Sequence, residues 1–313
     1  MTESPDQAAA PTPVAPITEA RRLAWAILAR AALTASAAVD ELLAAADGDP
    51  ERVAARLTIA PAAVGVPADL AGLAVRDLER AAAVGARLLT REDPQWPTAR
   101  FARLDAPQVC GHAPLALWLR GPRRLDPFAE DTVAVVGARA ATDYGSRVAY
   151  EMAATFAERG WTVISGGAFG IDTAAHRGAL GHPASTIAVT ATGIDRYYPI
   201  GNQRLLEQIS TEALMVSEYP PQTGPARDQF LQRNRITVAL ARAVVIVEGG
   251  RVRGGSANTA RWARELARPV FAVPGPITSA ASGGPHALIR DGHARLITDA
   301  TQVIDDLRAT PGI

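Results

Sequence analysis

The feature that most constrains this fold is a buried strand that runs directly into a turn. Residues 133–136 are apolar without alternation, and Gly137, Ala138 and Arg139 follow them at once. This pattern predicts a strand covered on both faces, then a turn and a helix from about Gly145. Such a junction points backbone amides and a helix N-terminus at one spot, which suits a phosphate. We therefore expect Gly137 and Arg139 to bind a phosphate.

The same order recurs along the chain. Residues 162–165 enter a loop with Gly166, Gly167 and Gly170, and a helix is expected from Asp172. Further strands are expected near residues 186–190, 214–218, 243–247 and 269–273, with helices from about Asn202, Arg233 and Ser256. This alternation implies right-handed βαβ units and an α/β, extended Rossmann-like, doubly wound parallel sheet. Two phosphate-type loops on neighbouring strands would form one groove for several anions.

Composition changes along the chain and suggests four segments. Residues 1–17 are rich in Pro and Ala and predict a disordered leader. Residues 18–90 are rich in Ala and Leu, with breaks at 47–50 and 64–67, and predict a small domain of four or five short helices. Residues 91–308 then form the sheet domain, including a strand near 115–121, and residues 309–313 are a short tail.

The basic residues are all arginine, because the sequence contains no lysine. This excludes a Walker-type phosphate loop, a pyridoxal Schiff base and a lysine nucleophile. The net charge is zero, yet residues 227–264 hold eight arginines against two acidic residues, a local charge of +6. Arginine favours bidentate contacts to phosphate and stacking on bases. A local positive stripe on a neutral protein suits a groove that follows a nucleic-acid backbone.

Other classes of protein are disfavoured by what the sequence lacks. The single cysteine, Cys110, excludes an intramolecular disulfide and a multi-thiolate zinc site. Asp172 and His176 lie one helical turn apart, but no third ligand is near, so capping and structural roles are favoured over a metal. The turn after residues 133–136 lacks the second glycine of a dinucleotide fingerprint. We expect no cofactor, no membrane span and no signal peptide, and hence a cytoplasmic protein.

The sharpest signal for ligand binding lies between residues 227 and 236. Phe230 follows Arg227 and precedes Arg233 and Arg235, so an aromatic ring stands beside basic side chains. This combination is used to bind single strands, where a ring stacks on bases and arginines contact phosphates. The alternative is that Phe230 packs in the core and the arginines pair with acidic residues.

Two further segments add to the expected groove. Arg253, Gly255 and Ser256 belong to a third glycine-rich loop before a helix, which again offers amides to phosphate. Tyr197 and Tyr198 follow the third strand of the parallel sheet and either stack on a base or belong to the core.

Taken in order, these motifs resemble the DNA-processing protein A (DprA/Smf) family. The matching segments span about residues 90–308 and are Gly137-Ala138-Arg139, Tyr144-Gly145, Ser165-Gly166-Gly167-Ala168, Gly170-Ile171-Asp172, His176, Tyr198-Pro199, Ser217-Glu218, Phe230, Arg233-Asn234-Arg235, Gly255-Ser256, Pro274-Gly275 and Leu288-Ile289. The resemblance implies a SAM-like N-terminal helical domain and DNA contacts from Arg139, Arg227, Phe230 and Arg253. The chain departs from the family pattern at Gly254-Gly255-Ser256 and at His286. It ends at Ile313, so we expect no C-terminal winged-helix domain.

The function that the resemblance implies is non-enzymatic. Members of the family bind single-stranded DNA, commonly form homodimers, and load the RecA recombinase onto DNA during natural transformation. The predicted DNA-binding residues here are Gly137, Arg139, Gly166, Gly167, Arg227, Phe230, Arg233, Arg235, Arg253, Gly255 and Ser256. One alternative is a Rossmann-like nucleotide-processing enzyme of the phosphoribohydrolase type, although Glu248-Gly249-Gly250-Arg251 lacks that enzyme's motif. Another is a purely structural oligomer.

Overall fold

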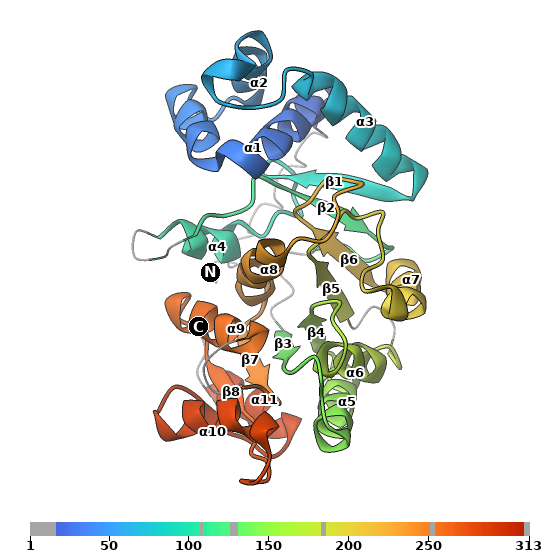
Figure 1. The fold of residues 1–313 in the computed structure, drawn as a ribbon, viewed down its shortest axis with the longest axis vertical. Coiled ribbons are helices and arrows are strands. Elements are labelled where there is room, and N and C mark those ends of the chain that lie inside the picture. The colour runs from blue at the N-terminus through green and yellow to red at the C-terminus, as the bar shows by residue number, and fades with distance from the viewer. Residues whose placement is uncertain are drawn as a thin grey trace, which may run out of the picture.

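The computed structural model describes residues 17–106, 109, 111–125, 131–182, 186–250 and 254–309. Its centre is a nine-stranded sheet in the order β1-β2-β6-β5-β4-β3-β7-β8-β9, which runs along the length of the molecule (Figure 1). The strands are β1 (Ala86–Thr90), β2 (Ala116–Arg120), β3 (Thr132–Val136), β4 (Thr162–Ser165), β5 (Thr186–Thr190), β6 (Leu214–Ser217), β7 (Ala243–Ile246), β8 (Val270–Ala272) and β9 (Arg295–Leu296).

In sheet order, the seven neighbouring strands β6-β5-β4-β3-β7-β8-β9 are parallel to one another. This arrangement confirms the doubly wound fold. Strands β4, β5 and β6 follow β3 on one side, whereas β7, β8 and β9 follow on the other. The direction of winding therefore reverses between β3 and β7. Ligands of such sheets bind beyond the carboxyl ends of the strands at this reversal.

Strand β1 corrects the predicted extent of the N-terminal helical segment. Residues up to 90 were expected to be helical, but Ala86–Thr90 pairs with β2, and β2 pairs with β6, both antiparallel. The last helix of this segment ends at Ala83. The short strand was missed because it has an arginine among apolar residues and only five residues in all.

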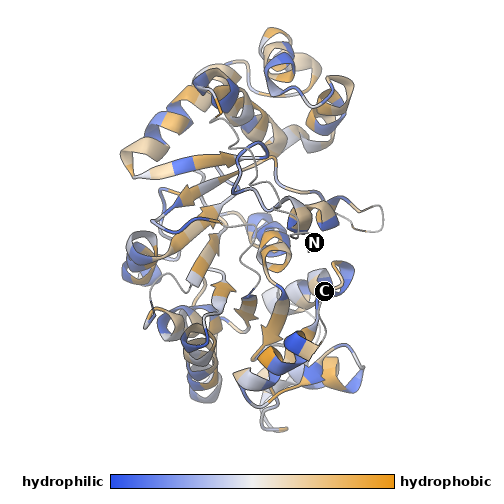
Figure 2. Cartoon of the chain, turned by 180° about the vertical axis from the view of Figure 1, so that it is seen from behind, coloured by the Kyte–Doolittle hydropathy of each residue, from blue (hydrophilic) through white to orange (hydrophobic). Residues whose placement is uncertain are grey.

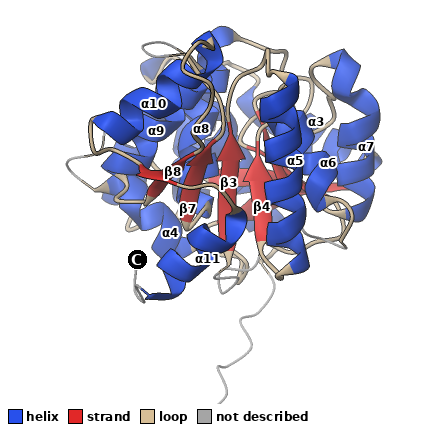
Figure 3. Cartoon of the chain, turned by 90° about the horizontal axis from the view of Figure 1, so that it is seen from below, coloured by secondary structure: helices blue, strands red, loops and turns tan. Residues whose placement is uncertain are grey.

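Helices cover both faces of the parallel strands (Figure 3). Alternate residues of β3 separate the two layers, since Val133 and Val135 face one apolar cluster and Ala134 and Val136 face another. One layer contains α5, α6 and α11, and the other contains α8 and α9. The bounds are α4 (Thr98–Phe101), α5 (Asp143–Glu158), α6 (Ile171–Ala179), α7 (Gln203–Glu212), α8 (Arg227–Leu240), α9 (Gly255–Glu265), α10 (Gly283–Arg290) and α11 (Ala300–Ala309), with 3₁₀ turns at Pro61–Ala63, Ala102–Asp105, Ile200–Asn202 and Ala280–Ser282.

Three helices pack over the β1–β2 end of the sheet. They are α1 (Glu19–Ala45), α2 (Pro50–Ile59) and α3 (Leu70–Ala83). Instead of several short helices, α1 is one long element kinked at Ala35. By length and composition α1 could cross a membrane, which is weak evidence since helices of soluble cores pass the same test. Here its apolar residues pack with α2 and α3 in one core, and Arg30 Nη2 donates to the buried Asp77 at 2.6 Å.

The hydropathy of the ribbon follows this layering (Figure 2). The strands are predominantly apolar, and the covering helices alternate between apolar and polar residues. The polar loops that follow β3, β4 and β7 therefore collect at the carboxyl edge of the sheet, where the fold places a ligand site.

Candidate nucleic-acid interface

A pocket of about 910 Å³ opens at the carboxyl ends of β3 and β7. The loops after β3, β4 and β7 line it, together with the first turns of α8 and α9. Of the predicted site residues, the structure brings together Gly137, Arg139, Arg227, Phe230, Arg233, Gly255 and Ser256 in this lining. Gly166 and Gly167 are buried behind it. Arg253 lies outside the described residues.

Two exposed arginines give the pocket its positive charge. Arg139 and Arg227 are solvent-exposed, and neither forms an ion pair within the part of the chain that the structure describes. The Arg139 guanidinium carbon lies 5.1 Å from the centre of the Phe230 ring. This cation–π contact holds the side chain over the pocket without an acidic partner. Both charges are therefore available to an external anion.

The N-terminus of α5 does not provide the open phosphate site that the sequence predicted. Glu248, which is 2% exposed, accepts hydrogen bonds from the Thr142 amide at 2.9 Å and the Thr142 hydroxyl at 2.6 Å. Thr142 Oγ1 in turn accepts from the Gly145 amide at 3.1 Å. Here the protein's own carboxylate occupies the place of an anion at a helix N-terminus. Arg139 is thus part of the pocket, but the helix behind it is already capped.

The N-terminus of α9 is open toward the pocket instead. Its N-cap residue is Gly254, with φ of 144° and no side-chain cap. Gly254 and Gly255 are exposed, and a Cβ on either would meet no atom of the described residues within 4 Å. Amides of a first helical turn that lack a capping side chain are donors for an anion. This end of the pocket keeps the phosphate-binding geometry that the end of α5 lacks.

Arg233 lies beneath the pocket rather than on its rim. The residue is 6% exposed and its Nη1 donates to the carbonyl of Val189 in β5. A Cβ on Gly166 would lie 2.5 Å from both Arg233 Nη2 and Asp172 Oδ2, so only glycine fits between these two groups and the strand. Burial lowers the pKa of Arg233, the Asp172 carboxylate opposes this, and the Arg139 guanidinium adds to it. Arg233 is therefore a buried charge that supports the pocket floor.

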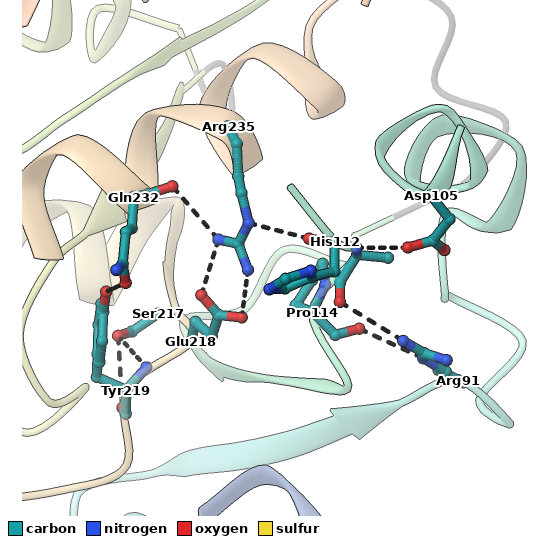
Figure 4. A network of polar contacts seen from close by, with 10 residues as sticks. Arg91, Asp105, His112, Pro114, Ser217, Glu218, Tyr219, Gln232 and Arg235 are labelled. Atoms are coloured by element: carbon teal, nitrogen blue, oxygen red, sulfur yellow. Dashed lines mark hydrogen bonds and ion pairs between the residues drawn. The ribbon is translucent and has the colours of Figure 1, made fainter. Parts of the chain in front are cut away.

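Arg235 points toward Glu218 and His112 (Figure 4). It is not part of the pocket lining, so the structure does not place it in the predicted groove. Its Nη1 and Nη2 donate to the two carboxylate oxygens of Glu218 at 2.8 and 2.6 Å, and Nε donates to the His112 carbonyl at 3.0 Å. Burial lowers the pKa of Arg235, but Glu218 outweighs burial and the pKa is raised. Residues two apart on a helix point about 200° away from each other. The two arginines therefore cannot face one groove.

Asn234, between these arginines, connects the two helices of the pocket. Its Nδ2 donates to Asn258 Oδ1 at 3.0 Å, which ties α8 to the first turn of α9. The three residues of the Arg-Asn-Arg segment thus contact different parts of the protein. Arg233 contacts β5, Asn234 contacts α9, and Arg235 contacts Glu218 and the His112 carbonyl. The sequence indicated the importance of this segment but not this division of contacts.

A buried histidine, His176, forms a hydrogen bond with the loop that contains Gly166. His176 Nε2 lies 2.6 Å from the Gly166 carbonyl oxygen, so this nitrogen donates, and Nδ1 lies 2.7 Å from Thr186 Oγ1. Burial lowers the pKa of His176 to about 4. Among the described residues no group of three potential metal ligands occurs. The neutral ring therefore positions the loop.

Asn202 and Glu248 are functional supports that sequence reasoning missed. Asn202 Nδ2 contacts the Gly167 and Ala168 carbonyls at 3.0 and 3.1 Å and fixes the same loop. Asn202 was identified only as a helix start, and Glu248 only as an acid in a loop. A buried strand that ends in an acid, as residues 243–248 do, is the signal that could have identified Glu248 as a cap.

Comparison with known proteins gives one consistent result. The family model for DNA recombination-mediator protein A matches residues 87–308. A relative from Mycobacterium tuberculosis (strain ATCC 25618 / H37Rv), which carries the name DprA, is 50% identical over 236 residues, 74% of this chain and 60% of the relative. The DNA processing protein DprA of Streptococcus pneumoniae (strain ATCC BAA-255 / R6) is 41% identical over 192 residues, 61% of this chain and 66% of the relative.

Solved structures agree with the sequence relatives. The X-ray structure of DNA processing protein A from Streptococcus pneumoniae superimposes with a TM-score of 0.68 at 30% identity, covering 93% of this chain and 98% of that chain. A structure of DNA processing protein A from Helicobacter pylori, reported for its single-stranded DNA binding mode, gives a TM-score of 0.61 at 29% identity, covering 72% of this chain and 96% of that chain. The chain spans less than two thirds of the length of the Mycobacterium tuberculosis relative.

Proposed function

We propose, from the premise that this chain belongs to the DNA recombination-mediator protein A family, that it binds single-stranded DNA in the pocket between β3 and β7. The observation that carries the proposal is the pair of exposed arginines, Arg139 and Arg227, which have no ion pair among the described residues and lie beside the N-terminus of α9. The structure from Helicobacter pylori, which concerns single-stranded DNA binding, supports the same ligand class.

The pocket favours a polymer over a single nucleotide. A dinucleotide would place its pyrophosphate at the N-terminus of the helix after the first parallel strand. In this chain Glu248 caps that helix, α5, and would repel a phosphate. The remaining donors lie on the Arg139 loop, on α8 and at the start of α9. Donors separated in this way suit successive phosphates of one strand.

Several finer statements extend the proposal. The chain passes bound DNA to the RecA recombinase during natural transformation, acts in the cytoplasm as a homodimer, and catalyses no reaction on the DNA. Gly137, Gly255 and Ser256 contact the DNA from the pocket lining, while Gly166, Gly167, Arg233 and Arg235 support the site from within. The helical part preceding β1 is a domain that packs against the β1–β2 end of the sheet and shares its core with these strands.

The test is a titration of labelled oligonucleotides with the purified protein. We expect single strands to bind more tightly than duplexes, with a salt slope of about −0.7 per phosphate contacted. Arg139→Ala should weaken binding by about five- to ten-fold for every sequence, because it removes a phosphate contact. The matched control is Arg52→Ala, an exposed arginine on α2. Unchanged affinity of Arg139→Ala, or salt-independent binding by the wild type, would contradict the proposal.

The enzymatic alternative has its own assay. A phosphoribohydrolase would release free base from a nucleoside monophosphate. Release of free base by the purified protein that is lost in the Glu248→Gln variant would favour the enzyme over the binding protein.

A further inference from the structure

Three large side chains next to the pocket are exposed. Phe169 follows β4, and Tyr198 and Ile200 follow β5, with exposed fractions of 48%, 42% and 75%. Single exposed apolar residues are common on protein surfaces, but adjacent ones mark a binding surface. We call Phe169 and Tyr198 the aromatic strip, and Ile200 lies beside it.

Contacts show that the strip is continuous with the pocket. The Tyr198 ring centre lies 5.6 Å from that of Phe230, which in turn lies under Arg139. The Phe169 ring lies 2.9 Å from where a Cβ on Gly201 would be, so it packs beside the Ile200 segment. The amide of Ile171, two residues after Phe169, donates to the Ala138 carbonyl at 3.2 Å. The strip thus extends from the Arg139 loop across the ends of β4 and β5.

The same contacts limit what Phe230 can do. Its ring is half-buried, with Arg139 against it on one side and Tyr198 tilted at 43° beside it. A base entering from the pocket therefore meets more free ring surface on Tyr198 and Phe169 than on Phe230. Bases stack on such rings without regard to sequence.

From this arrangement we infer that the aromatic strip is a base-stacking track, which binds the nucleotides of a single strand that continue beyond the cationic pocket toward β5. The inference rests on the proposed function and adds residues, a direction and a mode of contact to it. Phosphates are held at the Arg139 and α9 end, and unpaired bases lie on Tyr198 and Phe169. A duplex, whose bases are already stacked, gains nothing from the track.

The test separates the contribution of the bases to binding affinity from that of the sugar-phosphate backbone. Fluorescence anisotropy is measured with an oligothymidylate and with an abasic deoxyribose-phosphate strand of equal length. We expect the wild type to prefer the oligothymidylate, and Phe169→Ala to weaken binding of that ligand about ten-fold while leaving the abasic strand unchanged. Tyr150→Ala, which truncates a ring that is 50% exposed on α5, is the matched control and should change neither affinity.

Two conservative variants distinguish stacking from packing. Phe169→Trp should retain the preference for bases, whereas Phe169→Leu should lose it, because leucine is apolar but has no ring. The inference is overturned if Phe169→Ala leaves both affinities unchanged, as expected of a surface that binds a protein, or lowers both equally. If the wild type binds neither ligand, the proposed function itself fails.

Discussion

The two edges of the parallel sheet both carry arginines, but they use them in opposite ways. At the amino edge, Arg100 and Arg268 donate to the Leu240 and Ala239 carbonyls near the end of α8, at 2.7 and 3.2 Å. Arg103 and Arg242 donate to the Leu266 and Leu307 carbonyls, at the ends of α9 and α11. At the carboxyl edge, Arg139 and Arg227 have no ion pair within the described ranges.

Helix polarity explains the difference. In a parallel α/β fold the helices end at the amino edge, where their free carbonyls are negative, and begin at the carboxyl edge, where their amides are positive. The arginines at the first edge are therefore satisfied within the protein, as are the buried Arg233 and Arg235. Among the described residues, the exposed Arg139 and Arg227 at the second edge have no acidic partner. The count of basic residues along a segment does not reveal a binding surface, whereas their position relative to the sheet does.

The largest expected effect tests an arginine that is satisfied internally. Glu218→Ala removes the carboxylate that pairs with Arg235, whose side chain is only 9% exposed. This change should lower the free energy of unfolding by about 3 kcal/mol, because the buried Arg235 charge would be left without a partner. Urea denaturation measures the loss, and Asp69→Ala, which breaks the exposed pair with Arg76, should cost under about 1 kcal/mol. Equal losses would show that burial does not distinguish the two pairs.

A similar effect should appear as a pH dependence. Because burial lowers the pKa of His176 to about 4, the unfolded chain binds a proton more readily than the folded one. The stabilising contribution is complete above about pH 6.5 and is lost as pH falls toward 4, about 3 kcal/mol in all. Urea denaturation at a series of pH values, with the His176→Gln variant as the control, isolates this contribution. A wild-type profile parallel to that of His176→Gln would contradict a neutral buried ring.

The smallest effects sharpen the comparison directly. Arg103→Ala should lower the unfolding free energy by about 1 kcal/mol, because the Leu266 carbonyl loses a charged donor, and should leave DNA affinity unchanged. Arg227→Ala should do the reverse, with stability within about 0.5 kcal/mol of wild type and DNA affinity several-fold lower. Denaturation and anisotropy on both variants provide the check. If each variant changed both quantities alike, the two edges would not differ in role.

The sequence was sufficient for the parallel strands β3 to β8 and for the polar loops at their carboxyl ends. Uninterrupted apolar runs such as 133–136 are typical of strands covered on both faces, and each was followed by a polar turn. Five-residue β1 lacked such a run, and it was missed. Helix α8 begins at Arg227, earlier than expected, where the Gln229 side chain accepts from the Ala226 amide at 2.9 Å. That glutamine was a readable start signal.

The directions in which the side chains of the site point could not be predicted from the sequence. Residues 233–240 of α8 are all buried, so no amphipathic pattern indicates which face meets the sheet. The destinations of Arg233 and Arg235 depend on Val189 and Glu218, which are distant in sequence. The DNA contacts expected of individual residues stay predictions.

The buried carboxylate of Glu248 also has a consequence for selectivity in the cell. Free nucleotides are abundant in cells. Sheets of this kind ordinarily bind nucleotide phosphates at the N-terminus of the helix that follows the first parallel strand. Here the Glu248 carboxylate, which is covalently part of the chain, occupies that position. A small phosphorylated ligand would meet a negative charge there, so the proposed single-strand site would discriminate against free nucleotides without a conformational change.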